Sequence, residues 1–120
     1  MIVNAMPQTV RFEAGGKNYG MTFDLMALAE AEQAYKRQYG EQINAYGIIA
    51  ELTGGSLSAL MAAAYGAMRS AGEKMAWDTF ARHVFPACDM DWWTETVSGG
   101  LVSLFGGSTD DDAAEGDAKN

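Results

Sequence analysis

The segment HVFPACD holds the densest group of reactive side chains, because His83, Cys88 and Asp89 lie within seven residues. A cysteine nucleophile needs a positioned base and surroundings that lower the pKa of its thiol. His83 and Cys88 are five residues apart with Pro86 between them, so one regular helix cannot set their geometry. We therefore expect a small buried thiol and a helix-end histidine. A cysteine-dependent enzyme is the least favoured alternative.

The chain contains few side chains that could bind a metal ion or a cofactor. One histidine and one cysteine fall short of the usual zinc ligand sets. The acidic run DDDAAEGD lacks the spacing of a calcium-binding loop, and the 14 glycines form neither GxGxxG nor a P-loop pattern. We predict no enzyme activity, no metal site and no cofactor.

The charge balance argues against two classes of partner. Eight Lys and Arg face 16 Asp and Glu, which gives a net charge of −8. Without a basic stripe the chain is not expected to bind nucleic acid or an anionic membrane surface. No apolar run reaches the ~18 residues of a membrane span, and MIVNAMPQTV lacks a signal-peptide pattern. We expect a cytoplasmic protein.

The N-terminal part of the chain has the alternating apolar and polar pattern of a β-hairpin. In TVRFEAGGKNYGMTF, apolar and polar residues alternate on both sides of Gly15-Gly16, and such a glycine pair suits a tight turn. We predict strands over 8–14 and 17–23, with Gly20 as a candidate bulge. Two strands alone are marginal in water, so the hairpin must pack on the helices or pair with another chain.

From Asp24 onward the apolar residues recur at helical spacing. We predict a helix over 25–39 capped by Asp24, one over 41–53, and one from 57 to near Gly72 capped by Ser56. A short helix ended by Pro86 and a last helix capped by Asp89 or Asp91 follow. Gly99-Gly100 predicts a kink or a close contact in that helix. The fold class is α+β, mainly α, with one globular domain over 1–105 formed by the hairpin (8–23) and a helical body (25–105).

Residues 106–120 are predicted to be a flexible acidic tail. Five acids and one lysine lie there, with too little apolar surface to offset the entropy of ordering. The last residues Ala118-Lys119-Asn120 permit the codons GCA-AAA-AAC. These contain the heptamer A-AAA-AAC, on which ribosomes can slip back one base, so a longer product is a hypothesis that the DNA sequence tests.

Methionine and tryptophan favour a role in protein binding. Eight methionines and three tryptophans are many for this length, and both residue types are over-used at binding surfaces. Adjacent Trp92 and Trp93 diverge by about 100° on a helix, so at least one is expected to reach a partner. The residues assigned to partner binding are Trp92, Trp93, Met61, Met68, Tyr65 and Phe105.

Three segments resemble the small tail assembly chaperones of long-tailed phages and gene transfer agents. They are TVRFEAGGKNYGMTFDLMALAEAEQAYKRQYG, ELTGGSLSALMAAAYGAM and MAWDTFARHVF. The first has a strand with Arg11-Phe12, a glycine turn, a strand ending Thr22-Phe23-Asp24, and a helix that ends at a glycine. The similarity covers residues 8–86, and 87–105 lie outside it.

The resemblance implies a non-enzymatic chaperone. Such proteins bind the long, helical, apolar tape-measure protein, help recruit tail-tube subunits and leave before the particle is finished, and many also have a frameshifted longer form. The expected partners are the tape-measure and tail-tube proteins, with a homo-oligomer left open. The expected location is the bacterial host cytoplasm and not the mature virion. The alternative is a structural tail-completion or connector protein whose hairpin joins a ring by strand addition.

Overall fold

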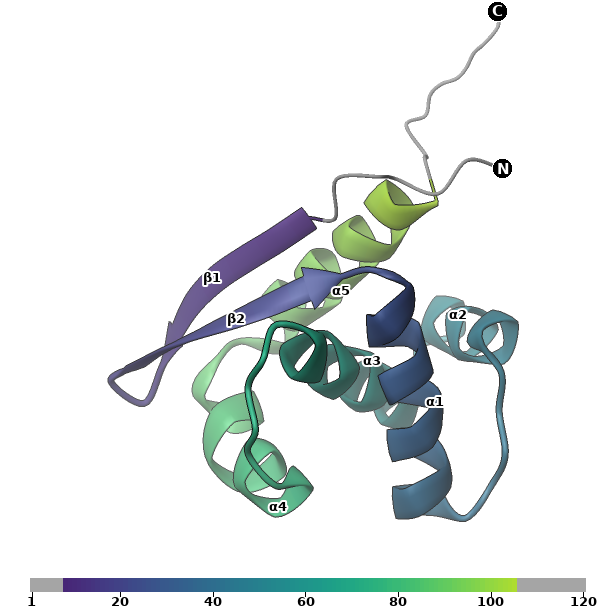
Figure 1. The fold of residues 1–120 in the computed structure, drawn as a ribbon, viewed down its shortest axis with the longest axis horizontal. Helices are drawn as coiled ribbons and strands as arrows, with labels where there is room; N and C mark the ends of the chain where they lie inside the picture. Colours follow the sequence, from purple (N-terminus) through teal and green to yellow (C-terminus); the bar gives the residue numbers. More distant parts are fainter. Residues whose placement is uncertain (1–7, 106–120) are drawn as a thin grey trace, which may run out of the picture.

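The computed structural model describes residues 8–105, in which an antiparallel hairpin lies against a group of short helices (Figure 1). The predicted mainly helical α+β fold with an N-terminal hairpin is confirmed. The predicted acidic tail, 106–120, and the slippage site in its last three codons lie outside the described residues. The elements are β1 (Gln8–Ala14), β2 (Lys17–Phe23), α1 (Leu25–Tyr39), α2 (Ala45–Thr53), α3 (Leu57–Ser70), α4 (Trp77–Thr79) and α5 (Met90–Leu104).

The hairpin forms where the alternating pattern predicts it. Gly15 and Gly16 have φ angles of +58° and +82°, the left-handed region that a two-residue hairpin turn requires at both positions. The core-facing residues Phe12, Ala14, Met21 and Phe23 are buried. The predicted bulge at Gly20 is wrong, because Gly20 pairs with Arg11 in an uninterrupted register. A Cβ at position 20 would lie 3.1 Å from Nη1 of Arg11, so the missing side chain makes room for that guanidinium.

Helices α1 and α3 form the most extensive contact between helices, and both begin at the predicted caps. The Asp24 carboxylate accepts the N–H of Ala27 at 2.9 Å, and the Ser56 hydroxyl accepts that of Ala59 at 3.1 Å. The two helices cross closely at Gly66, where a Cβ would lie 2.4 Å from the carbonyl oxygen of Ala27. Small residues therefore let the two backbones meet, and α3 is buried along most of its length.

Helix α2 is shorter than predicted. It begins at Ala45 rather than at residue 41, because Gly40 ends α1 in the left-handed conformation (φ 76°) and the chain stays outside a helix until Asn44. The side-chain oxygen of Asn44 accepts the N–H of Gly47 at 2.8 Å. Asparagine is among the preferred N-cap residues, and this signal for the start of α2 was missed.

The segment between α4 and α5 changes helical type twice. A π-helical turn covers Phe80–Val84 and a 3₁₀ turn covers Phe85–Ala87. The short helix that Pro86 was predicted to end stops at Val84, and Pro86 lies near the start of the 3₁₀ turn that follows, where a proline replaces no intrahelical donor.

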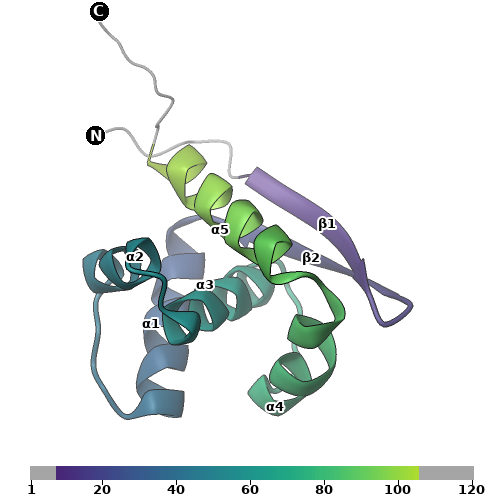
Figure 2. The ribbon, with the colours of Figure 1, turned by 180° about the vertical axis from the view of Figure 1, so that it is seen from behind.

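Helix α5 packs on the hairpin and α3 (Figure 2). Its Trp93, Val97, Leu101 and Leu104 are buried, and the indole N–H of Trp93 donates to the carbonyl of Phe85 at 2.8 Å. The helix is continuous through Gly99-Gly100. A Cβ at Gly100 would lie 2.3 Å from the Phe23 ring. A close contact therefore exists at Gly100, but its partner is a strand residue and not a second helix.

Candidate protein-binding groove

The segment around Cys88 does not assemble the features of an activated nucleophile. His83 is exposed on the π-helical turn. The Cys88 thiol is partly buried and donates weakly to the carbonyl of Glu13 at 3.8 Å. Burial raises the pKa of the Cys88 thiol, which lowers the thiolate fraction at neutral pH and is the reverse of activation. Within residues 8–105, no group of three or more His, Cys, Asp and Glu side chains could hold a metal ion.

Three of the six residues assigned to partner binding lie in the core. Trp93, Met68 and Tyr65 are almost fully buried. Trp93 stacks on Phe85 with ring centroids 5.0 Å apart, and the Tyr65 hydroxyl donates to the carbonyl of Met75 at 2.9 Å. A partner cannot reach these side chains in this conformation, so their positions give no support to a binding role. They were assigned from residue types that are enriched at binding surfaces, and residue type does not tell which apolar side chains a neighbouring element covers.

The other three residues keep accessible surface but do not gather at one site. Trp92 is half-buried against the hairpin, with its ring centroid 5.2 Å from that of Phe12. Met61 on α3 is also half-buried. Of the six, Phe105 lines an apolar hollow between two helices, α2 and α5.

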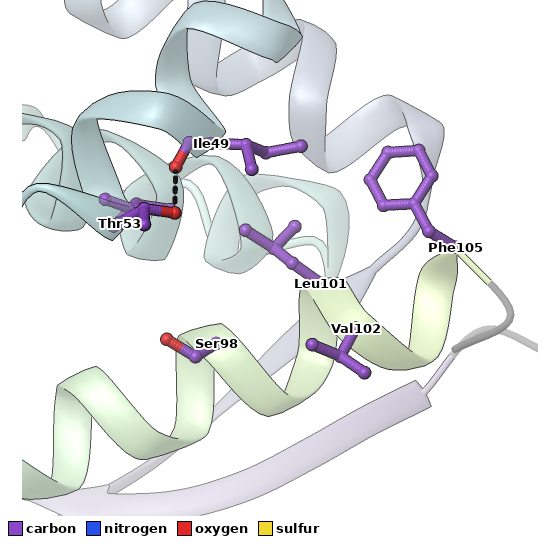
Figure 3. A pocket seen from close by; sticks show the side chains of 7 residues that line it. Ile49, Thr53, Ser98, Leu101, Val102 and Phe105 are labelled. Carbon is purple, nitrogen blue, oxygen red and sulfur yellow. Dashed lines mark hydrogen bonds between the residues drawn. The ribbon is translucent and has the colours of Figure 1, made fainter. Parts of the chain in front are cut away.

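That hollow lies between α2 and the C-terminal half of α5 (Figure 3). Its volume is about 350 Å³, and its lining is mainly aliphatic and aromatic. The Thr53 hydroxyl donates to the carbonyl of Ile49 at 2.9 Å, so this donor is satisfied within α2. The lining residues are Ile49, Leu52, Thr53, Ser98, Leu101, Val102 and Phe105.

A second, smaller hollow of about 80 Å³ continues along α5 toward its N-terminus. It shares Leu52 and Ser98 with the first, so the two form one depression, here called the α5 groove. At its far end Leu57 and Met90 leave half or nearly half of their surface exposed. The residues of the second hollow are Leu52, Gly55, Ser56, Leu57, Leu60, Met90, Thr94 and Ser98.

The α5 groove has an asymmetric charge distribution. No Lys, Arg, Asp or Glu lines either hollow. On α5, helical spacing of about 100° per residue places Asp91 and Glu95 in one row with Val102, next to the groove row of Thr94 and Ser98. Both acids are exposed. The groove therefore offers an apolar floor with carboxylates along one rim.

Most of the residues that form the groove were missed from the sequence. Ile49, Leu52, Ser98 and Val102 were not assigned to binding, although the run Leu101-Val102-Ser103-Leu104-Phe105 carried a usable signal. Four large apolar residues among the last four positions of α5 and its C-cap Phe105 span more than one face. One face of α5 packs on the domain, and the apolar residues that this face does not use indicate a second apolar surface.

Comparisons of this chain with protein-family models, with curated proteins and with solved structures find no match. Among residues 8–105, no helix is both long enough and apolar enough to cross a membrane.

Proposed function

We propose that this protein is a non-enzymatic assembly chaperone for the tail of a long-tailed phage or gene transfer agent. It binds an apolar helical segment of the tape-measure protein, keeps that client soluble and helps to recruit tail-tube subunits. The observation that carries the proposal is the uncharged α5 groove, lined from α2, α3 and α5. The resemblance of residues 8–86 supplies the class of client.

The size of the groove suits a helix. The 15 residues of α5 extend over about 22 Å at 1.5 Å per residue, and that length accommodates about four turns of a client helix. Helix-in-groove recognition uses apolar anchors at i, i+3, i+4 and i+7. Leu57, Met90 and Val102 have exposed fractions of 50%, 47% and 58%, and a bound helix would cover them.

The charges support a chaperone that keeps an apolar client in solution. A net charge of −8 opposes aggregation of the loaded complex. The rim carboxylates of Asp91 and Glu95 favour a client helix that carries Lys or Arg beside its apolar face. The proposal places the protein in the host cytoplasm during assembly and leaves it out of the finished particle.

Binding of tape-measure segments to matched pairs of variants tests the proposal. In the groove variant, Val102→Gln is combined with Leu57→Gln. The control combines Met26→Gln with Leu25→Gln on α1, whose exposed fractions of 58% and 56% match but which do not line the groove. The neutral amide avoids interaction with the helix dipoles. Synthetic segments of about 20 residues, each about 30 Å long as a helix, cover the whole tape-measure sequence.

At least one segment should bind the wild-type protein and the α1 control equally. The same segment should bind the groove variant about tenfold more weakly or worse, because two apolar anchors lose their contacts. Equal binding by all three proteins would show that the client uses another surface, and binding of no segment would remove the tape-measure protein as the client.

The alternative, a structural tail-completion or connector protein, draws on the open outer edge of β1, since a sheet edge can accept a strand from another chain. The two functions differ in whether the protein is present in the finished particle. Stoichiometric amounts of the chain in purified particles would contradict the chaperone proposal and support the structural one.

A further inference from the structure

The two edges of the hairpin differ in how their outward backbone groups are paired within the described residues. Ala14 and Lys17 flank the two-residue turn, so they form a hydrogen-bonded pair and the ladder alternates from there. Residues 9, 11 and 13 of β1 and 18, 20 and 22 of β2 therefore direct their backbone groups outward. On β2 the outward N–H of Gly20 is satisfied by the Glu73 carboxylate at 2.9 Å.

In the described part of the chain no further strand covers the outer edge of β1, and Cys88 contacts this edge at its Glu13 end. Within residues 8–105 β1 pairs only with β2, and in both ribbon views no described element lies beyond that edge (Figures 1 and 2). The Cys88 thiol approaches the Glu13 carbonyl at 3.8 Å, and a carbonyl oxygen has a second lone pair for another donor. The edge is therefore available for pairing.

The side chains of β1 discriminate between the ways in which two copies could pair. Antiparallel pairing with full overlap places Arg11 opposite Arg11 of the other copy, and like charges directly opposite are destabilising. A shift of the register by two residues keeps the outward backbone groups matched. It places Arg11 opposite Glu13 of the other copy, and by symmetry this ion pair forms twice.

A hollow beside the same edge favours this register. It is lined by Arg11, Phe12, Glu13, Cys88, Asp89 and Trp92. Glu13 points to the same solvent-facing side of the strand as Arg11, so its carboxylate is the one that Arg11 of a second copy would reach. The rings of Phe12 and the half-buried Trp92 supply apolar surface near the two-fold axis.

We propose that this edge is a self-association site: two copies pair their β1 strands antiparallel, with Arg11 of each copy opposite Glu13 of the other. The result is a four-stranded sheet with its helices on one face. This dimer does not depend on the α5 groove, since none of the residues that line the groove lies on β1.

Sedimentation equilibrium of the full chain and its charge variants tests the proposal. The measurements include a reducing agent, because an intermolecular Cys88 disulfide would mimic the dimer. Arg11→Glu and Glu13→Arg each turn both ion pairs into like-charge pairs, and each should weaken dimerisation by about tenfold or more. The double variant R11E/E13R restores opposite charges in the same register and should recover most of the wild-type affinity.

The double variant distinguishes loss of the ion pair from a folding defect even if one single variant folds poorly. Both side chains are exposed, and circular dichroism verifies that each variant keeps its fold. A wild-type protein that stays monomeric up to about 1 mM, where binding is worth only about 4 kcal/mol, would overturn the proposal. So would a dimer that neither single variant weakens, or one that the double variant fails to restore.

Discussion

Gly99 and Gly100 are consecutive residues of α5 with opposite surroundings. A Cβ at Gly99 would meet nothing within 4 Å, whereas a Cβ at Gly100 would lie 2.3 Å from the ring of Phe23. Glycine at position 100 is a packing requirement, because β2 and α5 approach there with no room for a methyl group. Glycine at position 99 costs helix stability and has no steric reason in the described structure.

The pair gives a matched prediction for stability. Gly100→Ala should lower the free energy of unfolding by about 1–3 kcal/mol, because the methyl group must displace the Phe23 ring. Gly99→Ala should raise it by up to about 1 kcal/mol, since alanine is the better helix former. Urea denaturation of both variants measures the difference, and equal effects would contradict the packing of Phe23 on α5.

Cys88 gives a prediction about pH. Burial raises the pKa of its thiol, so the reactive thiolate appears only at higher pH than in an unfolded chain. The rate of alkylation by iodoacetamide should therefore rise with pH, with a midpoint above that of the urea-unfolded protein. The raised pKa also means that Cys88 contributes to stability. This contribution is fully present below the pKa of the unfolded chain and is lost as the pH rises through the pKa of the folded protein. A folded-state midpoint below the unfolded one would indicate an activated thiol and revive the enzyme alternative.

At the scale of elements, α5 has two apolar surfaces with different roles. Trp93, Val97 and Leu104 hold the helix on the domain, while Val102 and Phe105 line the groove. The helix is therefore packed through its first surface without a partner. Its second surface is the one that the proposed client covers.

Filling the groove should separate folding from client binding. Ser98 is exposed and lines both hollows of the α5 groove, so Ser98→Phe places a ring where the client helix would lie. Unfolding stability should change by no more than about 0.5 kcal/mol, as is usual for surface sites, while client binding is lost. Ser98→Ala is the control and should bind normally. Undiminished binding by Ser98→Phe would exclude the groove as the binding site.

Local signals explain why most elements could be predicted from the sequence. Alternation around Gly15-Gly16 specifies the hairpin, and Asp24 and Ser56 specify the starts of α1 and α3. The start of α2 was misplaced because the Asn44 cap was overlooked. The π-helical turn over Phe80–Val84 had no recognisable signal, since its geometry depends on how the surrounding aromatic rings pack.

The groove could not be predicted in the same way, because it forms between α2 and α5, which are far apart in the sequence. Whether Trp93 or Val102 faces solvent depends on how α5 lies across the hairpin and α3, and helical periodicity does not contain that rotation. At least one of Trp92 and Trp93 was expected to be accessible, and Trp92 is the one that keeps accessible surface. Trp93, Met68 and Tyr65 were assigned to binding although they are large apolar residues, and a small core buries such residues readily.

At the scale of the whole molecule, the proposed binding surfaces lie on different elements. The α5 groove is lined from α2, α3 and α5, and the self-association edge belongs to β1. A dimer formed through β1 therefore leaves both grooves accessible. The groove variants should dimerise normally, and R11E should bind client segments normally, so each surface has its own readout.

Co-expression measures whether the proposed groove keeps an apolar client soluble. The measured quantity is the soluble fraction of the tape-measure protein expressed alone, with the wild-type chain, with the V102Q/L57Q variant and with the L25Q/M26Q control. We predict that the wild-type chain and the control raise the soluble fraction severalfold, because the client's apolar helices are covered, while the groove variant leaves it near that of the client alone. A soluble fraction that the wild-type chain does not raise, or that the groove variant raises equally, would show that the groove does not keep the client soluble.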